Sequence, residues 1–214
     1  MLDTDIALKK LPLVAVIRGL DIGRIKDVGT TLIEAGFTLI EVTLNSPEPL
    51  KAIEILVEIS GQSASIGAGT VLSVQDVKDV KTAGGQFIIS PNMDEDVIRE
   101  TKNCGLVSWP GVFTPTEAFN ALKYGADGLK AFPAESISPQ TLKAWRAVLP
   151  LNTQIFIVGG VDAASMKPYL AAGAGGFGLG SSLVSANKSL EDIRRDAVEI
   201  VTAYHDAVES LSNG

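Results

Sequence analysis

The sequence has one cysteine and one histidine among its 214 residues. The single cysteine, Cys104, excludes an intramolecular disulfide, and we expect an inert thiol in a reducing, cytoplasmic compartment. The single histidine, His205, cannot build a catalytic zinc site of the usual histidine-rich kind. It lies in a charged helical stretch, where we expect it to be solvated. The chemistry must therefore depend mainly on lysine, carboxylate, tyrosine or backbone groups, and we expect no metal.

Long apolar runs and basic clusters are also missing. No apolar run is long enough to span a bilayer, and we expect no signal peptide, because residues 1–12 predict a short surface helix. Acidic residues outnumber basic ones by 25 to 18, which gives a formal net charge of −7. This balance argues against nucleic acid or an anionic membrane as a partner.

A repeated unit fills most of the chain: a short apolar run, a polar turn and a helical segment. The runs that predict strands lie at residues 13–17, 38–43, 64–68, 86–90, 106–110, 127–132, 154–158 and 175–179. They are mostly continuously apolar, as in a parallel sheet covered by helices. About eight strand–helix units predict an α/β fold, a (β/α)₈ TIM barrel, for which about 200 residues is the lower limit. A doubly wound open sheet is the alternative, but the regular spacing favours one barrel domain over residues 1–214.

Capping residues support these helices. Several helical segments end in glycine, which suits the left-handed position after a helix. Thr114 and Glu117 form a capping-box pattern with Pro115 at the first helical position. The residues that we expect to cap helix N-termini are Ser73, Asp94, Thr114, Ser138 and Asp162.

Lys130 is the sharpest chemical signal, because it stands late in the apolar run 127–132. Lysine is almost never fully buried without a partner or a purpose. Burial lowers the pKa of an amine, and the neutral amine is a nucleophile that forms a Schiff base with a ketone. The structural alternative is a rim lysine whose amine reaches water.

Glu41 is the second signal, a carboxylate inside the apolar segment 39–44. A carboxylate in such surroundings has a raised pKa and can transfer protons. The structural alternative is an ion pair with Arg18, which stands at the end of the neighbouring predicted strand. Arg18 could equally bind a substrate carboxylate.

Two glycine-rich turns follow the last two predicted strands, Gly159-Gly160 and Gly180-Ser181-Ser182. Glycine lets backbone N–H groups approach an anion closely, and loops after these strands form the common phosphate site of TIM barrels. The alternative is that the glycines serve only tight turns, but two such turns favour a phosphate site.

Other strand ends carry weaker candidates. Three residues there could line the pocket, although each also suits a turn or core packing: Thr70, Pro91 and Phe132. Trp109 is more simply interpreted as a buried aromatic.

The segment 173–178, GAGGFG, matches the dinucleotide pattern by letters alone. That fingerprint needs a strand before it and a helix after it, whereas here a predicted helix precedes the segment and its second half is itself the predicted strand. We therefore expect no dinucleotide site.

Six short segments at the predicted strand ends form a recognisable series. They are Glu41-Val42-Thr43-Leu44, 67–72, 89–91, 110–111 with 114–117, 129–134 and 158–161. The series resembles the KDPG/KDPGal aldolase family over nearly the whole chain, from about residue 12 to residue 182. The resemblance implies a class I aldolase without metal or cofactor, on a (β/α)₈ barrel, usually assembled as a homotrimer. Such enzymes cleave a phosphorylated 2-keto-3-deoxy sugar acid to pyruvate and glyceraldehyde 3-phosphate.

The resemblance also implies roles for individual residues. Lys130 would be the Schiff-base lysine and Glu41 the proton shuttle. The pyruvate half would be surrounded by Arg18, Thr70 and Pro91. The phosphate would be held by Gly159, Gly160, Gly180 and Ser181.

Two positions favour one branch of the family. Gluconate-type enzymes carry arginine shortly after the Glu-Val-Thr segment and threonine before the Gly-Gly pair, where this chain has Asn45 and Val158. With Ile17-Arg18-Gly19 in the first strand, the chain resembles the 2-dehydro-3-deoxy-6-phosphogalactonate (KDPGal) branch, which serves galactonate breakdown. The alternatives are the gluconate-epimer aldolase, another barrel enzyme for a phosphorylated substrate, and a non-catalytic phosphosugar sensor.

Overall fold

The strands close into a barrel through one interrupted strand. The computed structural model describes residues 1–213, whose parallel sheet has the order β5-β4-β3-β2-β1-β9-β8-β7-β6. At its two ends are β5 (Val107–Trp109) and β6 (Gly111–Val112), which are consecutive pieces of one strand broken at Pro110. Since β5 pairs with β4 and β6 pairs with β7, the sheet closes. The predicted (β/α)₈ barrel is confirmed, and the open sheet is wrong.

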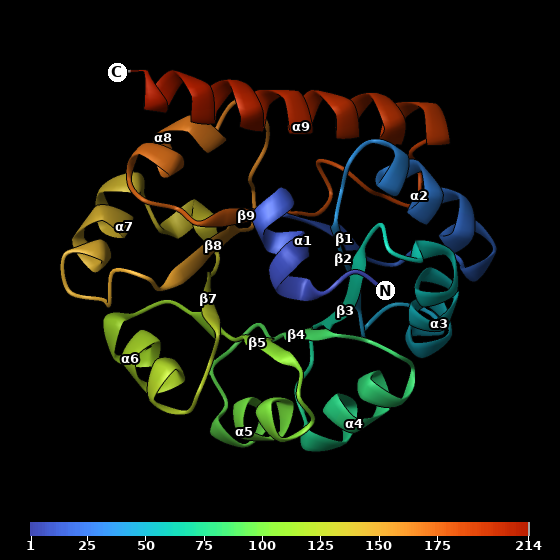
Figure 1. Ribbon diagram of the computed structural model, residues 1–214, viewed down its shortest axis with the longest axis horizontal. Helices are drawn as coiled ribbons and strands as arrows, with labels where there is room; N and C mark the ends of the chain where they lie inside the picture. Colours follow the sequence, from blue (N-terminus) through green and yellow to red (C-terminus); the bar gives the residue numbers. More distant parts are fainter. Residues whose placement is uncertain (214) are drawn as a thin grey trace.

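The other strands closely match the predicted apolar runs. They are β1 (Leu13–Ile17), β2 (Leu39–Thr43), β3 (Ser65–Gly69), β4 (Phe87–Ile89), β7 (Gly128–Ala131), β8 (Gln154–Val158) and β9 (Gly176–Leu179). Around them lies a ring of helices (Figure 1). Its members are α2 (Ile22–Glu34), α3 (Pro49–Ser60), α4 (Val74–Thr82), α5 (Glu95–Asn103), α6 (Pro115–Lys123), α7 (Pro139–Arg146), α8 (Met166–Ala171) and α9 (Leu190–Ser212), with a 3₁₀ turn η1 (Ala134–Ser136) after β7.

Four of the predicted caps are confirmed and one is wrong. The N-caps of α4, α5, α6 and α7 are Ser73, Asp94, Thr114 and Ser138, and Thr114 forms the capping box with Glu117. Helix α8 begins only after Ser165. Asp162 instead closes the turn before α8, where its carboxylate accepts a hydrogen bond from the Ser165 backbone N–H at 2.9 Å. A turn satisfied in this way delays the helix.

The short N-terminal helix α1 (Thr4–Lys10) covers the barrel rather than lying freely on its surface (Figure 1). Leu2 and Ala7 are buried and belong to the same apolar cluster as Val14, Leu39 and Phe87 inside the barrel. Only the other side of the helix, with Lys9 and Lys10, is exposed. The expected short helix is confirmed, and its inner face is buried because the amino-terminal mouth of an apolar barrel must be covered.

Strand alternation decides which side chains face the barrel axis. Successive residues of a strand point to opposite faces, so the neighbours of the inward side chains pack outward against the helices. Phe87, Trp109 and Phe156 fill the interior, and their ring centroids lie 5.2 and 4.7 Å apart in succession. Glycines on adjoining strands leave space for them, since a Cβ on Gly67 or Gly176 would collide with Phe87 or Phe156. This aromatic layer closes the barrel below the carboxyl ends of the strands.

Candidate active site

A cavity of about 560 Å³ lies at the carboxyl ends of β1, β2, β7, β8 and β9. It gathers most of the predicted site residues, although they come from distant parts of the sequence. Those that line it are Arg18, Glu41, Lys130, Phe132, Val158, Gly159, Gly160, Gly180 and Ser181. The position agrees with the rule that barrel active sites lie at this face.

Lys130 is fixed in the wall of the barrel by β7. Its backbone N–H donates to the Pro110 carbonyl at 2.9 Å, and its side chain is buried, with 6% of the residue exposed. The amine lies 4.7 Å from the centroid of the Phe132 ring. Burial lowers the pKa of Lys130; the Glu41 carboxylate opposes this shift and Arg18 adds to it. A lowered pKa increases the fraction of neutral amine, which is the form that acts as a nucleophile.

Glu41 enters the same cavity from β2 and is 3% exposed. Its carboxylate lies over Gly69, where a side chain would overlap it. Burial raises the pKa of Glu41, while the charges of Lys130 and Arg18 oppose the rise. A carboxyl group whose pKa is raised is better suited to donate a proton as well as to accept one.

Neither Glu41 nor Lys130 has a protein partner for its ionisable group in the described part of the chain. Within residues 1–213, no hydrogen bond or ion pair at 4.0 Å or less joins Glu41 or Lys130 through its side chain to another protein group. Arg18 is exposed at the rim of the cavity, so the proposed structural ion pair with Glu41 is not formed. Buried polar groups are normally satisfied, and the exceptions call for an explanation. The cavity that both groups face supplies one, because a bound molecule can complete their interactions.

Two glycine turns, after β8 and β9, form another part of the cavity wall. Gly159 and Gly160 have positive φ angles of 99° and 70°, so the turn after β8 requires glycine. A Cβ on Gly180 would meet no neighbouring atom, which leaves the backbone after β9 open to the cavity. The two turns are joined by a 3.0 Å hydrogen bond from the Ser182 hydroxyl to the Val161 carbonyl. Their N–H groups can serve an anion.

Thr70 and Pro91 lie outside the lining of this cavity. Thr70 follows β3 with a φ of 58°, a strained conformation for a β-branched residue. Pro91 follows β4, and its carbonyl occupies the space beside Gly111 that a side chain would need. Strain of this kind gathers at functional sites, so Thr70 stays a candidate. Asn45 is exposed in the loop after β2 and does not line the cavity either.

Several lining residues escaped the sequence reasoning. They are Val16, Val161, Asp162, Gly178, Val184, Ser185 and Ala186. Alternation along β1 and β9 could have indicated Val16 and Gly178, since each lies one position from an outward-facing residue. No local pattern distinguishes the segment 183–186 from an ordinary loop. This segment reaches the site because the chain passes the cavity on its way from β9 to α9.

The remaining motifs have other roles. The GAGGFG segment follows α8 and its second half belongs to β9, with Gly176 facing Phe156, so the dinucleotide fingerprint lacks its context as expected. Trp109 is a buried core aromatic.

Among residues 1–213, no helix is both long and apolar enough to cross a membrane. The described part of the chain also contains no group of three acidic, histidine or cysteine side chains placed to hold a metal ion.

Comparison with known proteins decides the family. The family model described as "KDPG and KHG aldolase" matches residues 4–201. The chain belongs to the KDPG and KHG aldolase family. It is 46% identical to a protein of Rhizobium meliloti (strain 1021) named "Probable 2-dehydro-3-deoxy-6-phosphogalactonate aldolase", over 92% of each chain.

Two further relatives agree with this membership. The chain is 41% identical to the 2-dehydro-3-deoxy-6-phosphogalactonate aldolase of Escherichia coli (strain K12), over 94% of this chain and 98% of that one. A solved structure titled "Native KDPGal structure" superposes with a TM-score of 0.92 at 41% identity, and covers 94% of this chain and 97% of the other. The likeness to family members therefore extends over the barrel as a whole.

Proposed function

We propose that this protein cleaves 2-dehydro-3-deoxy-6-phosphogalactonate to pyruvate and glyceraldehyde 3-phosphate as a class I aldolase. One observation carries the proposal: a buried lysine and a buried carboxyl group, without protein partners, face one cavity that is also lined by a pair of glycine turns. The relatives named above supply the substrate class. The barrel provides a rigid frame on which an amine, a proton carrier and an anion site keep fixed positions.

The reaction follows from the state of the two ionisable groups. The neutral amine of Lys130 attacks the C2 ketone, and loss of water leaves a protonated imine. That cation accepts the electrons of the C3–C4 bond when a base removes the proton of the C4 hydroxyl. Glyceraldehyde 3-phosphate leaves, and the enamine on Lys130 is protonated at C3 and hydrolysed to pyruvate. Glu41, acting through a water, carries these protons.

The ends of the substrate are assigned to the ends of the cavity. Arg18 at the rim binds the substrate carboxylate, with Thr70 and Pro91 shaping the surroundings of the pyruvate half. The phosphate lies between the two glycine turns, at Gly159, Gly160, Gly180 and Ser181. Holding both ends places C4 above the lysine, and such orientation alone contributes strongly to the rate.

Val158 bears on the choice between the two C4 epimers. It closes β8 directly before the phosphate turn, and its methyl groups lie over Gly178 in the cavity wall. A valine presents no hydroxyl to the substrate, whereas the resemblance places threonine here in gluconate-type enzymes. We therefore assign the galactonate epimer as the preferred substrate.

We further propose a cytoplasmic homotrimer built from single-domain subunits. Large apolar side chains at Leu72, Phe113 and Phe119 are exposed on loops and helices of the barrel. Exposed apolar groups of this size suit subunit contacts, and sedimentation of the purified protein measures the oligomeric state. A monomer across the micromolar range would reject the trimer without touching the chemistry.

The decisive experiment is a coupled assay of pyruvate release from both C4 epimers. We expect cleavage of both, with the larger kcat/KM for the galactonate epimer. Binding of either compound without pyruvate release would instead indicate a sensor. An isomerase or epimerase would convert phosphorylated substrates without an imine, so pyruvate with borohydride would leave it unmodified.

A further inference from the structure

The segment between β9 and α9 has two sides with different neighbours. On one side Ser182, Ser185 and Ala186 line the cavity, next to Gly180 and Ser181. On the other side its backbone carbonyls face cations from the protein itself. The cavity wall at the phosphate end is therefore a loop held from behind.

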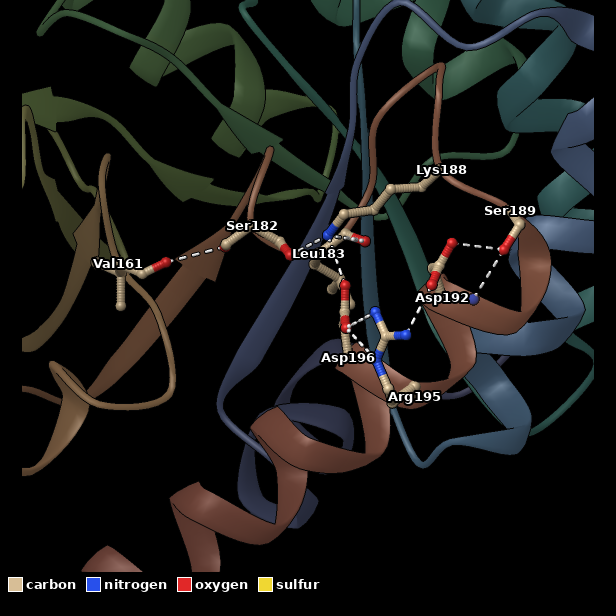
Figure 2. Close-up of polar contacts among 8 residues, drawn as sticks. All are labelled: Val161, Ser182, Leu183, Lys188, Ser189, Asp192, Arg195 and Asp196. Carbon is tan, nitrogen blue, oxygen red and sulfur yellow. Dashed lines mark hydrogen bonds and ion pairs between the residues drawn. The ribbon is translucent and has the colours of Figure 1, made fainter.

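Lys188 makes the principal contact behind this loop (Figure 2). Its amine donates a short hydrogen bond to the Ser182 carbonyl and lies 3.4 Å from the Leu183 carbonyl. The same amine is 2.6 Å from the Asp196 carboxylate, which belongs to α9. Both side chains are mostly buried, with 25% and 18% exposed, so this ion pair is less screened than one at the surface.

Two more anchors fix the rest of the loop. Arg24 on α2 donates to the Ala186 carbonyl at 2.5 Å and to the Lys188 carbonyl at 2.6 Å. On the cavity side, the Ser182 hydroxyl donates to Val161 of the other glycine turn. The loop is thus tied to α2, to α9 and to the turn after β8.

The contacts behind the loop also affect the cavity, because they fix the orientation of the backbone at residues 180–184. Leu183 and Val184 each donate a backbone hydrogen bond of 2.9 Å to the Gly180 carbonyl, which makes 180–184 one helical turn. In such a turn the first N–H groups and the last carbonyls point in opposite directions. A cation bound to the last carbonyls therefore holds the turn in an orientation in which the first N–H groups of the turn point away from α9. The cation also polarises the peptide groups that lie between the two ends of the turn.

We propose that Lys188 is a positioning residue for phosphate binding, acting through the Ser182 and Leu183 carbonyls with Asp196 as its anchor on α9. The inference rests on the proposed function, because it takes the glycine turns as the site of the substrate phosphate. Lys188 is not in the lining of the cavity and touches no reacting atom.

A simpler effect of charge must be separated from positioning. If Lys188 acted only through its field, removing the nearby negative charge of Asp196 would strengthen anion binding. If Lys188 acts by holding the loop, Asp196→Ala releases the amine and weakens anion binding. Burial of Asp196 disfavours its charge, but hydrogen bonds and charges of Lys188 and Arg195 outweigh this and lower its pKa, so the carboxylate is charged at neutral pH. The sign of the change therefore distinguishes the two effects.

The experiment measures the Kd of inorganic phosphate for the full chain by phosphorus NMR titration. Lys188→Met and Asp196→Ala are compared with Lys188→Arg, which keeps a donor and a charge. Lys167→Met is the matched control, because Lys167 is exposed and, among residues 1–213, its amine bonds only Ser210, at 2.8 Å. In parallel, the exchange of pyruvate methyl protons for deuterium reports imine and enamine formation at Lys130, which needs no phosphate.

We expect Lys188→Met and Asp196→Ala to raise the Kd of phosphate about tenfold, the scale of a charge-assisted hydrogen bond. Lys188→Arg should recover most of the affinity, and every variant should keep wild-type pyruvate exchange. Unchanged affinity in Lys188→Met, or tighter binding in Asp196→Ala, overturns the inference while the aldolase assignment stands. Loss of pyruvate exchange in wild type would instead count against the proposed function. If Lys188→Met does not fold, Asp196→Ala and Lys188→Arg still decide.

Discussion

The carboxylate of Glu41 lies over the α-carbon of Gly69, in space that any side chain at residue 69 would fill. The two residues are on adjacent strands, β2 and β3, whose register pairs Glu41 with Gly67 and Thr43 with Gly69. An acidic side chain two residues from the end of β2 can therefore lean across the neighbouring strand into the cavity. The absence of a side chain at Gly69 sets the position of the proton carrier.

Gly69→Ala should displace Glu41 and slow the enzyme. The added methyl group overlaps Oε1 and Cδ of Glu41. We expect kcat for aldol cleavage to fall by about 10²–10⁴-fold, the usual worth of a general acid–base, with a loss of about 1–3 kcal/mol in stability from overpacking. Steady-state kinetics and urea unfolding measure the two effects. In a Glu41→Gln background the same substitution should cost little further activity, and wild-type turnover in the single mutant would reject the relationship.

Lys130 should be the residue that forms the imine. Pyruvate with borohydride should attach a reduced three-carbon group to Lys130 and abolish activity, as mapped by peptide mass spectrometry. Lys102 provides an internal comparison, because its amine is paired with Asp127 at 2.5 Å and its side chain is 35% exposed. Lys102 does not line the cavity, so it should remain unmodified. An adduct on any other lysine would refute the assignment.

The pH dependence of pyruvate exchange should report the buried pair. Burial lowers the pKa of Lys130, so the neutral amine accumulates as the pH rises, and the midpoint of the exchange profile should lie below pH 10.5, the ordinary lysine value. The charge of Glu41 opposes this shift. Removing that charge lowers the pKa of Lys130 further, so Glu41→Gln should move the midpoint to lower pH, besides slowing exchange. Glu58→Gln, at an exposed position on α3, should leave the midpoint in place, and a midpoint that moved upward in Glu41→Gln would contradict the electrostatic argument.

Val158→Thr should shift the preference between the C4 epimers. Threonine nearly matches valine in size but adds a hydroxyl, so the change affects hydrogen bonding more than shape. We expect the ratio of kcat/KM values to move toward the gluconate epimer by about 2- to 13-fold, the worth of about 0.5–1.5 kcal/mol for one hydrogen bond. Asn45→Arg tests the other branch position, although Asn45 is exposed and outside the cavity. A wild-type preference for the gluconate epimer would reject the substrate assignment but not the aldolase chemistry.

The sequence by itself determined the barrel, its strands and the two ionisable candidates. Strand runs and helix caps are patterns of adjacent residues, and the preferences behind them act locally. For the same reason, a lysine and a glutamate inside apolar runs were visible as groups whose burial needs a reason. The mistake at Asp162 arose where a satisfied turn overrode the local pattern.

The tertiary structure alone decided how these groups meet. Three features depend on strand register and close packing. Gly69 leaves space for the Glu41 carboxylate, Thr70 and Pro91 lie outside the cavity wall, and Lys188 bonds the Ser182 carbonyl. Such distances depend on how every strand is staggered around the closed barrel, and no short stretch of sequence contains that information. The chemical type of each site residue is therefore visible in the local sequence, whereas the position of its side chain depends on the whole fold.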